Sequence, residues 1–443
     1  MACYAPFNSM FFNTRGQVLA CCFSHKISTA YTKNSIREIW FGEDFEKIRT
    51  HLKHNSLPDA CSVCRTQIEN GNYFSVESRT YDDFLPITDD YPTVMEFELE
   101  NTCNLECKMC VGELSSLIRK NREQLPPLQN PYGPEFVKEL EQFIPYLQKT
   151  SFIGGEPFLI KTYYAIWEKI IELNPQCRIA VTTNGTVLNS RIKDLLNRGK
   201  FEFVMSIDGL TKETYEKIRI NGKFEKVMDN FEYFYQYTRE RKSSFQVVPC
   251  PQKLNWHEMP LFIEFANKRN VLIYFSLAIR YPFDVCLWTL QPEELTHILE
   301  HYKKYRFPGK NRAEQHNKKM FDELVREVEM WRDEAVKREK RHAEESFEFD
   351  ESLISIMENH LQKYLEGESE LSENQKVNSK EKILNKTLEM LKLVPVYFNY
   401  EHFIEKITGI PPGVIFPWIE SASVGQYLSR SVHLLDTPYS GFS

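Results

Sequence analysis

Six short apolar runs recur between amphipathic segments over residues 93–278. Segments such as 161–173 and 188–198 repeat their apolar residues at helical spacing. Strands that alternate with helices pair in parallel, and spacings of roughly 25 to 55 residues fit right-handed strand–helix units. The pattern predicts an α/β fold, built as a doubly wound sheet or as a partial (β/α)6 TIM-type barrel. The predicted strands are centred on Phe97, Ile153, Val181, Met205, Val247 and Tyr274.

The first predicted strand, residues 93–100, alternates strictly between apolar and acidic side chains. Its apolar residues fall on one face, and Glu96, Glu98 and Glu100 fall on the other. We expect the apolar face to meet the covering helices and the carboxylates to face a lumen. In one interpretation Glu98 or Glu100 holds a polar or cationic part of a substrate. In the other, the carboxylates pair with lumen arginines or lysines, or the two faces are reversed.

The flanking segments differ from this central pattern. Residues 1–90 combine a hairpin that turns at Arg15-Gly16 with a helical pattern from Ser35 to His54. Beyond residue 290 the chain becomes rich in charged, helix-forming residues, with no glycine between Gly309 and Gly367. We therefore expect a small Cys-rich unit over 1–90, a barrel over 91–290 and a helix-rich extension over 291–443.

Composition narrows the class of protein. The 443 residues include 55 basic and 62 acidic ones, a net charge of −7, which argues against a nucleic-acid partner. No apolar run approaches the roughly 18 residues of a membrane-spanning helix, and no basic stretch followed by an apolar block opens the chain. We expect a cytoplasmic protein with no membrane partner.

The eleven cysteines indicate metal binding, because an odd number without an export signal does not suit a disulfide framework. Five lie in the first 64 residues and three form a tight group. Cys177 and Cys286 are interpreted as structural. Cys250, near the end of the fifth predicted strand, is a candidate hydrogen donor to a substrate, although a free cysteine is more often a buried apolar side chain.

The tight group, Cys103-x3-Cys107-x2-Cys110, directly follows the first strand. Three thiolates on one loop can hold three irons of a 4Fe-4S cluster and leave the fourth iron open to a ligand. Here the sequence resembles the radical SAM superfamily. The resemblance implies that S-adenosylmethionine (SAM) binds the open iron and is cleaved by one electron to a 5′-deoxyadenosyl radical, which abstracts hydrogen from a substrate. It also implies an external one-electron reductant such as flavodoxin or ferredoxin.

Further motifs match the SAM contacts of that family. They lie at the carboxyl ends of the second, third and fourth predicted strands, the functional face of such barrels. Glu156 is expected to accept hydrogen bonds from the ammonium group, Arg219 to pair with the carboxylate, and Met109 to lie near the adenine. The expected SAM-binding residues are Met109, Gly154, Gly155, Glu156, Thr183, Asn184, Ser206, Asp208 and Arg219.

A second group of cysteines precedes the barrel. Cys3, Cys21, Cys61 and Cys64 resemble the auxiliary-cluster segment of SPASM and twitch domains, which implies a fully ligated second 4Fe-4S cluster. In that family the segment follows the barrel, so the order is permuted here. Cys22 is an alternative to Cys21, and tetrahedral zinc is an alternative to iron–sulfur.

The resemblance implies a radical SAM oxidoreductase, and by analogy a peptide or protein side chain as its substrate. Dehydrogenation of a small alcohol or aminosugar, with the auxiliary cluster accepting the electron, is the second interpretation, and methyl transfer remains open. A third interpretation is a metal-binding interaction protein that has no catalytic activity.

Overall fold

The structure is a computed structural model of the 443-residue chain. It describes residues 3–22, 29–58, 61, 64–65, 68, 76–84, 90–276, 284–343, 351–369, 371–393, 400–422, 424, 427 and 431. The chain divides into two compact units, one of residues 1–249 and 266–274, the other of residues 250–265 and 275–443.

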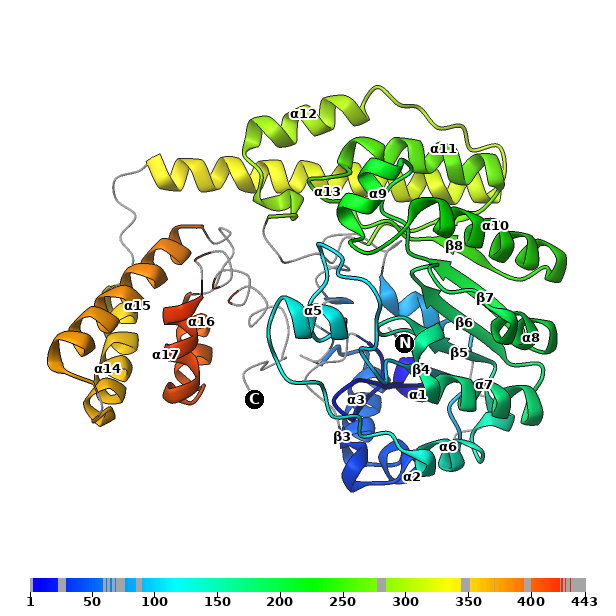
Figure 1. Cartoon of the computed structure of the whole chain (residues 1–443), viewed down its shortest axis with the longest axis horizontal. Helices are drawn as coiled ribbons and strands as arrows, with labels where there is room; N and C mark the ends of the chain where they lie inside the picture. Colours follow the sequence, from blue (N-terminus) through cyan, green and yellow to red (C-terminus); the bar gives the residue numbers. More distant parts are fainter. Residues whose placement is uncertain are drawn as a thin grey trace. The chain divides into compact units, whose positions relative to one another are not determined.

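The first unit is built on one nine-stranded sheet in the order β3-β2-β1-β4-β5-β6-β7-β8-β9 (Figure 1). From β4 to β9 every neighbouring pair is parallel, so all six predicted strands form and pair as expected. Two predicted centres, Ile153 and Tyr274, lie one residue beyond the ends of β5 and β9. The sheet is an open one and does not close into a barrel. The six strands are β4 (Val94–Phe97), β5 (Lys149–Phe152), β6 (Arg178–Thr183), β7 (Lys200–Met205), β8 (Phe245–Val247) and β9 (Leu272–Ile273).

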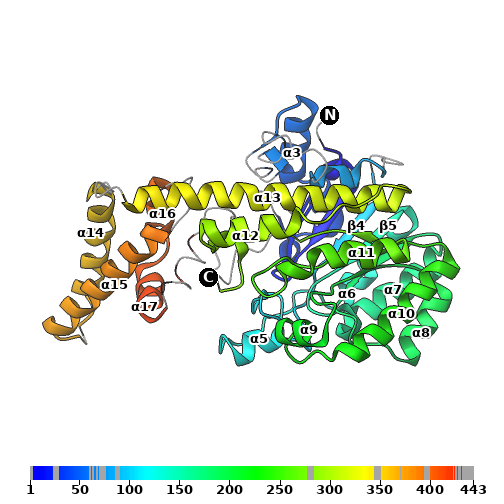
Figure 2. The ribbon, with the colours of Figure 1, turned by 90° about the horizontal axis from the view of Figure 1, so that it is seen from above.

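Most of the helices between these strands cover one face of the sheet, and α5 (Ser116–Asn121) lies apart from them (Figures 1 and 2). Their apolar stripes pack ring against ring on the strands: Trp167 meets Phe152 with centroids 5.4 Å apart, and Phe234 meets Phe203 at 4.4 Å. Side chains of Asn189 and Thr211 cap two of the helices. The helices are α5 (Ser116–Asn121), α6 (Pro134–Leu140), α7 (Lys161–Leu173), α8 (Ser190–Arg198), α9 (Lys212–Ile218) and α10 (Phe224–Arg241), with α11 (Met259–Arg269) following β8.

The N-terminal segment extends the same sheet. Strand β1 (Ser9–Phe12) pairs in parallel with β4, and β2 (Gln17–Leu19) pairs with β1 across the predicted hairpin, where Gly16 has φ +75°. The helical pattern from Ser35 to His54 was expected to be one helix, and this was wrong. It forms α2 (Ile36–Trp40) and α3 (Glu43–Lys53), because the chain breaks at Gly42, where a Cβ would lie 2.9 Å from a helix carbonyl. The remaining elements are α1 (Ala5–Asn8) and β3 (Thr29–Ala30).

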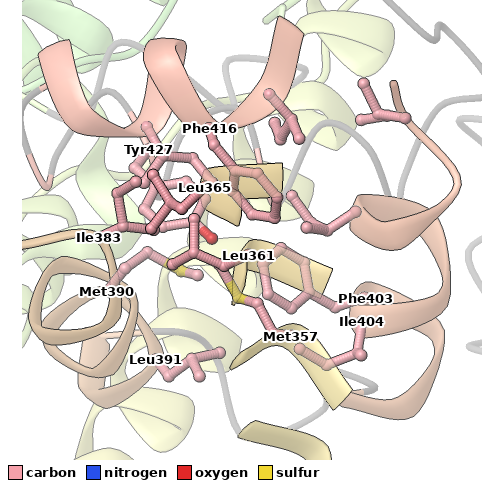
Figure 3. Packing of buried hydrophobic residues seen from close by; sticks show 14 of the residues in the cluster. Met357, Leu361, Leu365, Ile383, Met390, Leu391, Phe403, Ile404, Phe416 and Tyr427 are labelled. Atoms are coloured by element: carbon pink, nitrogen blue, oxygen red, sulfur yellow. The ribbon is translucent and has the colours of Figure 1, made fainter. Parts of the chain in front are cut away.

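The second unit is helical, as predicted for the C-terminal region. Figure 3 shows its core, in which α14 contributes Met357, Leu361 and Leu365 and the following helices contribute facing apolar residues. No helix of the described residues is long and apolar enough to cross a bilayer. The helices are α12 (Pro292–Tyr302), α13 (Arg312–Ala343), α14 (Glu351–Gly367), α15 (Glu373–Leu393), α16 (Tyr400–Thr408) and α17 (Pro412–Ser421).

Candidate cluster and cofactor site

The three-cysteine loop lies between β4 and α5. Cys107 is buried, and Cys103 and Cys110 are partly buried. The start of α5 holds the loop in shape: the Ser116 hydroxyl accepts a hydrogen bond from the backbone N–H of Cys103 at 3.2 Å, and the Ser115 hydroxyl donates to the carbonyl of Leu105 at 2.8 Å. Capping of a short helix therefore also positions the cysteines.

A second set of backbone contacts fixes the loop to the end of α9. The N–H groups of Glu106 and Lys108, on either side of Cys107, donate to the carbonyls of Ile220 (3.1 Å) and Ile218 (2.9 Å). These carbonyls flank Arg219. Cys107 and Arg219 therefore lie on two backbone segments that hydrogen-bond directly to each other.

The thiols lie within electrostatic range of one another. Burial raises the pKa of Cys107 to about 11 and also raises the pKa of Cys110 and of Cys103. Negative charge on Cys107 or Cys103 further raises the pKa of Cys110, whereas the Arg219 guanidinium lowers the pKa of all three. Three thiols on one loop, within electrostatic range of one another and of Arg219, suit an anionic thiolate-bound cluster. Among the described residues, no three Cys, His, Asp or Glu side chains are arranged to hold one single metal ion.

Glu156 ties the ends of β5 and β6 together. Its fully buried carboxylate accepts hydrogen bonds from the Thr183 hydroxyl (2.8 Å), the Asn184 N–H (2.7 Å) and the Phe158 N–H (3.2 Å). Burial raises the pKa of Glu156 to about 7, although these donors oppose the rise. Protein donors therefore already engage the carboxylate that the sequence assigns to the ammonium group of SAM.

Asn184 connects the hydrogen bonds of Glu156 to the cysteine loop. Its amide donates to the Asn104 side chain at 3.1 Å and lies 3.9 Å from the sulfur of Cys103. Asn104 in turn donates to the Thr186 hydroxyl at 2.9 Å. Sequence reasoning missed Asn104 and Thr186. A signal for them was available in the sequence. Asn104 directly follows Cys103, and Thr186 lies in the polar segment that follows the β6 strand.

The paired glycines lie against the loop itself. Gly154 and Gly155 have φ of +83° and +42°. A Cβ on Gly155 would lie 2.2 Å from the carbonyl oxygen of Thr102, and one on Gly154 would lie 2.9 Å from Cγ of Glu98. Only glycine lets the β5 turn approach the segment that leads to Cys103 this closely.

Arg219 and Asp208 form a buried ion pair, with Nε 2.6 Å from Oδ2. Both belong to the predicted SAM-binding set, and the structure joins them to each other. Ser206 lies in the same region, since its N–H donates to the carbonyl of Thr183 at 3.0 Å. Met109 is partly buried within the cysteine loop.

The three carboxylates in and after β4 have different environments. The apolar face packs as expected, with Phe97 against Phe136 of α6. Glu100 accepts hydrogen bonds from the side chains of Thr102 (3.1 Å), Asn130 (3.0 Å) and Thr162 (3.1 Å), and Glu96 from those of Tyr81 and Ser9.

Glu98 stands apart from its two neighbours. Within the described part of the chain no hydrogen bond to its carboxylate is found. Burial raises its pKa to about 7, and the charge of Arg15 only partly opposes the rise. A proton on Glu98 is therefore gained and lost near neutral pH.

A cavity of about 460 Å³ lies beside this segment. Its lining combines Leu99, Glu100 and Thr102 with residues of α5 and of the loop that follows α5. The full lining is Thr14, Leu99, Glu100, Asn101, Thr102, Ser116, Leu117, Arg119, Lys120, Leu125, Pro127, Leu128, Gln129 and Asn130.

Three N-terminal cysteines also come together. Cys3 is buried, and the nearby charges of Cys64 and Cys61 add to the burial that raises its pKa to about 12. Cys61 is likewise raised to about 11, first by burial and then by Cys64. Cys21 and Cys22 follow β2 and are each partly buried. Cys250, the candidate hydrogen donor, is partly buried in the second unit.

Comparison with known proteins identifies the first of these two sites. Residues 98–266 match the family model of the radical SAM superfamily. This segment belongs to the radical SAM superfamily. A radical SAM domain binds a 4Fe-4S cluster and SAM. The cysteine loop after β4 and the residues that contact Glu156 and Asn184 all lie within this domain.

The N-terminal cysteines also fall within a recognised domain. Residues 3–65 match the SPASM iron–sulfur cluster-binding domain. The SPASM domain here precedes the radical SAM domain, as the order of the motifs predicted.

Individual relatives resemble part of the chain. GTP 3′,8-cyclase of Helicobacter pylori is 25% identical over 191 residues, which cover 42% of this chain and 57% of that protein. The corresponding enzyme of Synechococcus elongatus is 28% identical over 183 residues, 41% of this chain and 53% of that protein. The chain spans little more than half the length of these relatives.

Among solved structures, native anSMEcpe with bound AdoMet is 19% identical, with a TM-score of 0.36, over 48% of this chain and 60% of that one. SuiB of Streptococcus suis bound to S-adenosylmethionine is 13% identical, with a TM-score of 0.35, over 59% and 57% of the two chains.

Proposed function

We propose that this protein cleaves SAM reductively and uses the product to take a hydrogen atom from a peptide or protein side chain. The observation that carries the proposal is the convergence of Cys103, Cys107 and Cys110 beside Arg219, in a domain of the radical SAM superfamily. A 4Fe-4S cluster held by these three cysteines would supply one-electron reductive cleavage of SAM, with an external reductant as the electron source, to methionine and a 5′-deoxyadenosyl radical.

The residues of the chain divide the work of holding these cofactors. The three cysteines would hold three irons, and the Asn184 amide keeps the loop beside the carboxyl end of β6. Glu156 fixes the backbone of Asn184, so that polar groups at the strand ends keep one arrangement when the cofactor binds. Met109, Thr183, Ser206, Asp208 and Arg219 are proposed to complete the SAM site.

The SPASM domain supports an oxidative outcome. We propose that Cys3, Cys21, Cys61 and Cys64 would hold a second 4Fe-4S cluster, which would supply an acceptor for the electron left on the substrate after hydrogen abstraction. The substrate then loses one hydrogen atom, one electron and one proton, a net two-electron oxidation. Glu98 suits the role of proton acceptor, because its carboxylate has a pKa of about 7 and no hydrogen bond from the described residues.

A second candidate is a small alcohol, aminosugar or nucleotide substrate. The cavity of about 460 Å³ beside Glu100 falls within the usual range for small-molecule sites. Relatives that are 25% and 28% identical to part of this chain are named GTP 3′,8-cyclases. Under this candidate the same hydrogen abstraction occurs, and Glu100 with its three neighbouring donors orients the hydroxyl groups.

Deuterium transfer separates the two candidates. The anaerobic, reconstituted full chain is incubated with SAM, dithionite and one perdeuterated probe at a time: a mixed peptide library, glucosamine or GTP. Deuterium in 5′-deoxyadenosine from the peptide library alone supports the peptide proposal, and deuterium from glucosamine or GTP alone contradicts it. A Cys107→Ala control establishes that the transfer needs the cluster.

A further inference from the structure

Tyr215 presents a buried hydroxyl group that has no hydrogen-bond partner among the described residues. The side chain is fully buried on α9. Nearly all buried hydroxyl groups find a partner, and leaving one unpaired costs about 1–3 kcal/mol. An unpaired hydroxyl inside a cofactor site therefore indicates an acceptor that is present only with the cofactor. This acceptor is either an atom of the cofactor or a protein atom that becomes negatively charged when the cofactor binds.

The position of Tyr215 directs it to the cysteine loop. Tyr215 and Arg219 are four residues apart, so their side chains leave the same face at the end of α9. This end of α9 is the one whose following backbone hydrogen-bonds to Glu106 and Lys108, on either side of Cys107. The loop and the tyrosine therefore share one small region.

Electrostatics agree with this placement. Burial is the main reason that the pKa of the Tyr215 hydroxyl is raised. Arg219 lowers this pKa, and negative charges on Cys107, Asp208 and Glu156 raise it further, with Cys107 the strongest of the three. Gly222 closes the other side of the ring, since a Cβ there would lie 3.0 Å from the Tyr215 oxygen. A neutral hydroxyl within electrostatic range of a thiolate is able to donate a hydrogen bond to its sulfur.

We propose that the Tyr215 hydroxyl donates a hydrogen bond to the sulfur of Cys107 when the cluster is bound, and so sets the reduction potential of the SAM-cleaving cluster. The inference rests on the proposed function, because it needs the cluster at this loop. Hydrogen bonds to the sulfurs of a cluster stabilise the more negative, reduced form, so they raise the potential. Tyr215 thereby makes the cluster easier for an external donor to reduce.

Redox titration followed by electron paramagnetic resonance tests the inference. The protein is the reconstituted full chain, and the signal followed is the one that changes when SAM is added. Tyr215→Phe keeps the ring and removes only the hydroxyl. We expect a more negative midpoint, so that at a fixed ambient potential the ratio of reduced to oxidised cluster falls several-fold and at most about tenfold.

A matched control is Tyr237→Phe. The Tyr237 hydroxyl accepts from Phe201 N–H (3.3 Å) and donates to Gly199 (3.2 Å) at the start of β7, the opposite end of the strand from the site. This variant also loses a buried hydroxyl but is expected to keep the wild-type midpoint.

Each outcome has one meaning. A midpoint unchanged in Tyr215→Phe, with full iron content, overturns the inference and leaves the proposed function intact. Wild-type protein that takes up no iron at this loop contradicts the proposed function itself. If Tyr215→Phe loses iron, electron–nuclear double resonance of the reduced wild-type protein, with and without exchange into D₂O, decides the question. A hydrogen bond from the Tyr215 hydroxyl to the cluster predicts a strongly coupled proton that exchanges with D₂O. The absence of such a proton would overturn the inference.

Discussion

The carboxylate of Glu156 accepts a hydrogen bond of 2.7 Å from the backbone N–H of Asn184, so a side chain after β5 holds the backbone after β6. Asn184 in turn contacts Asn104 and the sulfur of Cys103. The cysteine loop is thus supported from a neighbouring strand, and the polar motifs act as one network.

Glu156→Ala should disrupt this network. The substitution leaves the Thr183 hydroxyl and two backbone N–H groups without their acceptor, which should lower the free energy of unfolding by about 2–4 kcal/mol. Anaerobic urea denaturation measures the change, and equilibrium dialysis should show weaker SAM binding. Glu168→Ala, on the exposed side of α7, is the control and should leave SAM binding unchanged. Unaltered SAM affinity in Glu156→Ala would contradict the proposal that the Glu156 hydrogen bonds keep the SAM-binding residues in place.

Glu98 predicts a pH dependence of stability. Its pKa is about 7 in the folded protein against an ordinary value of 4.5, so between these values the folded state binds more protons than the unfolded state. Stability should therefore fall as pH rises from about 4.5 to about 7. Glu98→Gln removes this loss and should be more stable than wild type at pH 8, by roughly 1–3 kcal/mol after allowance for partial exposure. The two proteins should converge near pH 4.5, whereas exposed Glu240→Gln should show no such trend.

The cysteine loop predicts a stepwise loss of iron. Wild-type protein reconstituted without oxygen should contain about eight irons per chain, and Cys107→Ala should contain about four. Cys177→Ala should keep all eight, since Cys177 is a buried residue whose sulfur lies 4.0 Å from the Thr150 hydroxyl. Iron and sulfide assays measure all three, and equal iron in wild type and Cys107→Ala would be inconsistent with a cluster at this loop.

The N-terminal site offers a comparison of adjacent cysteines. Cys61→Ser should remove the second cluster and leave about four irons, together with full SAM cleavage. Cys21→Ser should behave in the same way, and Cys22→Ser should not. The reverse result would assign the ligand to Cys22. About four irons with one zinc in the wild type would replace the auxiliary cluster with a zinc site.

Asp208 predicts a large effect on stability. Asp208→Asn leaves the Arg219 guanidinium buried without its countercharge, which should lower the free energy of unfolding by about 3–5 kcal/mol. Adding Arg219→Gln should recover part of this loss, because the uncompensated charge is then gone. A double-mutant cycle by denaturant unfolding measures the coupling, and additive effects would contradict a buried pair.

Strict alternation and ligand spacing made most of the architecture predictable. The six parallel strands, the hairpin at Gly16 and the placement of Cys103 after β4 all follow from patterns within about ten residues. Contacts between distant segments were not predictable, because the spacing of residues along the chain does not show which side chains meet in space. The pairing of Arg219 with Asp208, the donors around Glu156 and the orphan hydroxyl of Tyr215 depend on how loops meet at the strand ends.

The most direct test of the central claim is the yield of 5′-deoxyadenosine from SAM and dithionite, measured under strict anaerobic conditions for the reconstituted wild-type chain and for Cys107→Ala. We expect 5′-deoxyadenosine and methionine in equal amounts from the wild type, and only background from the variant. A folded, iron-loaded wild-type protein that releases no 5′-deoxyadenosine above that background would contradict the central claim, and would favour a metal-binding protein without radical chemistry.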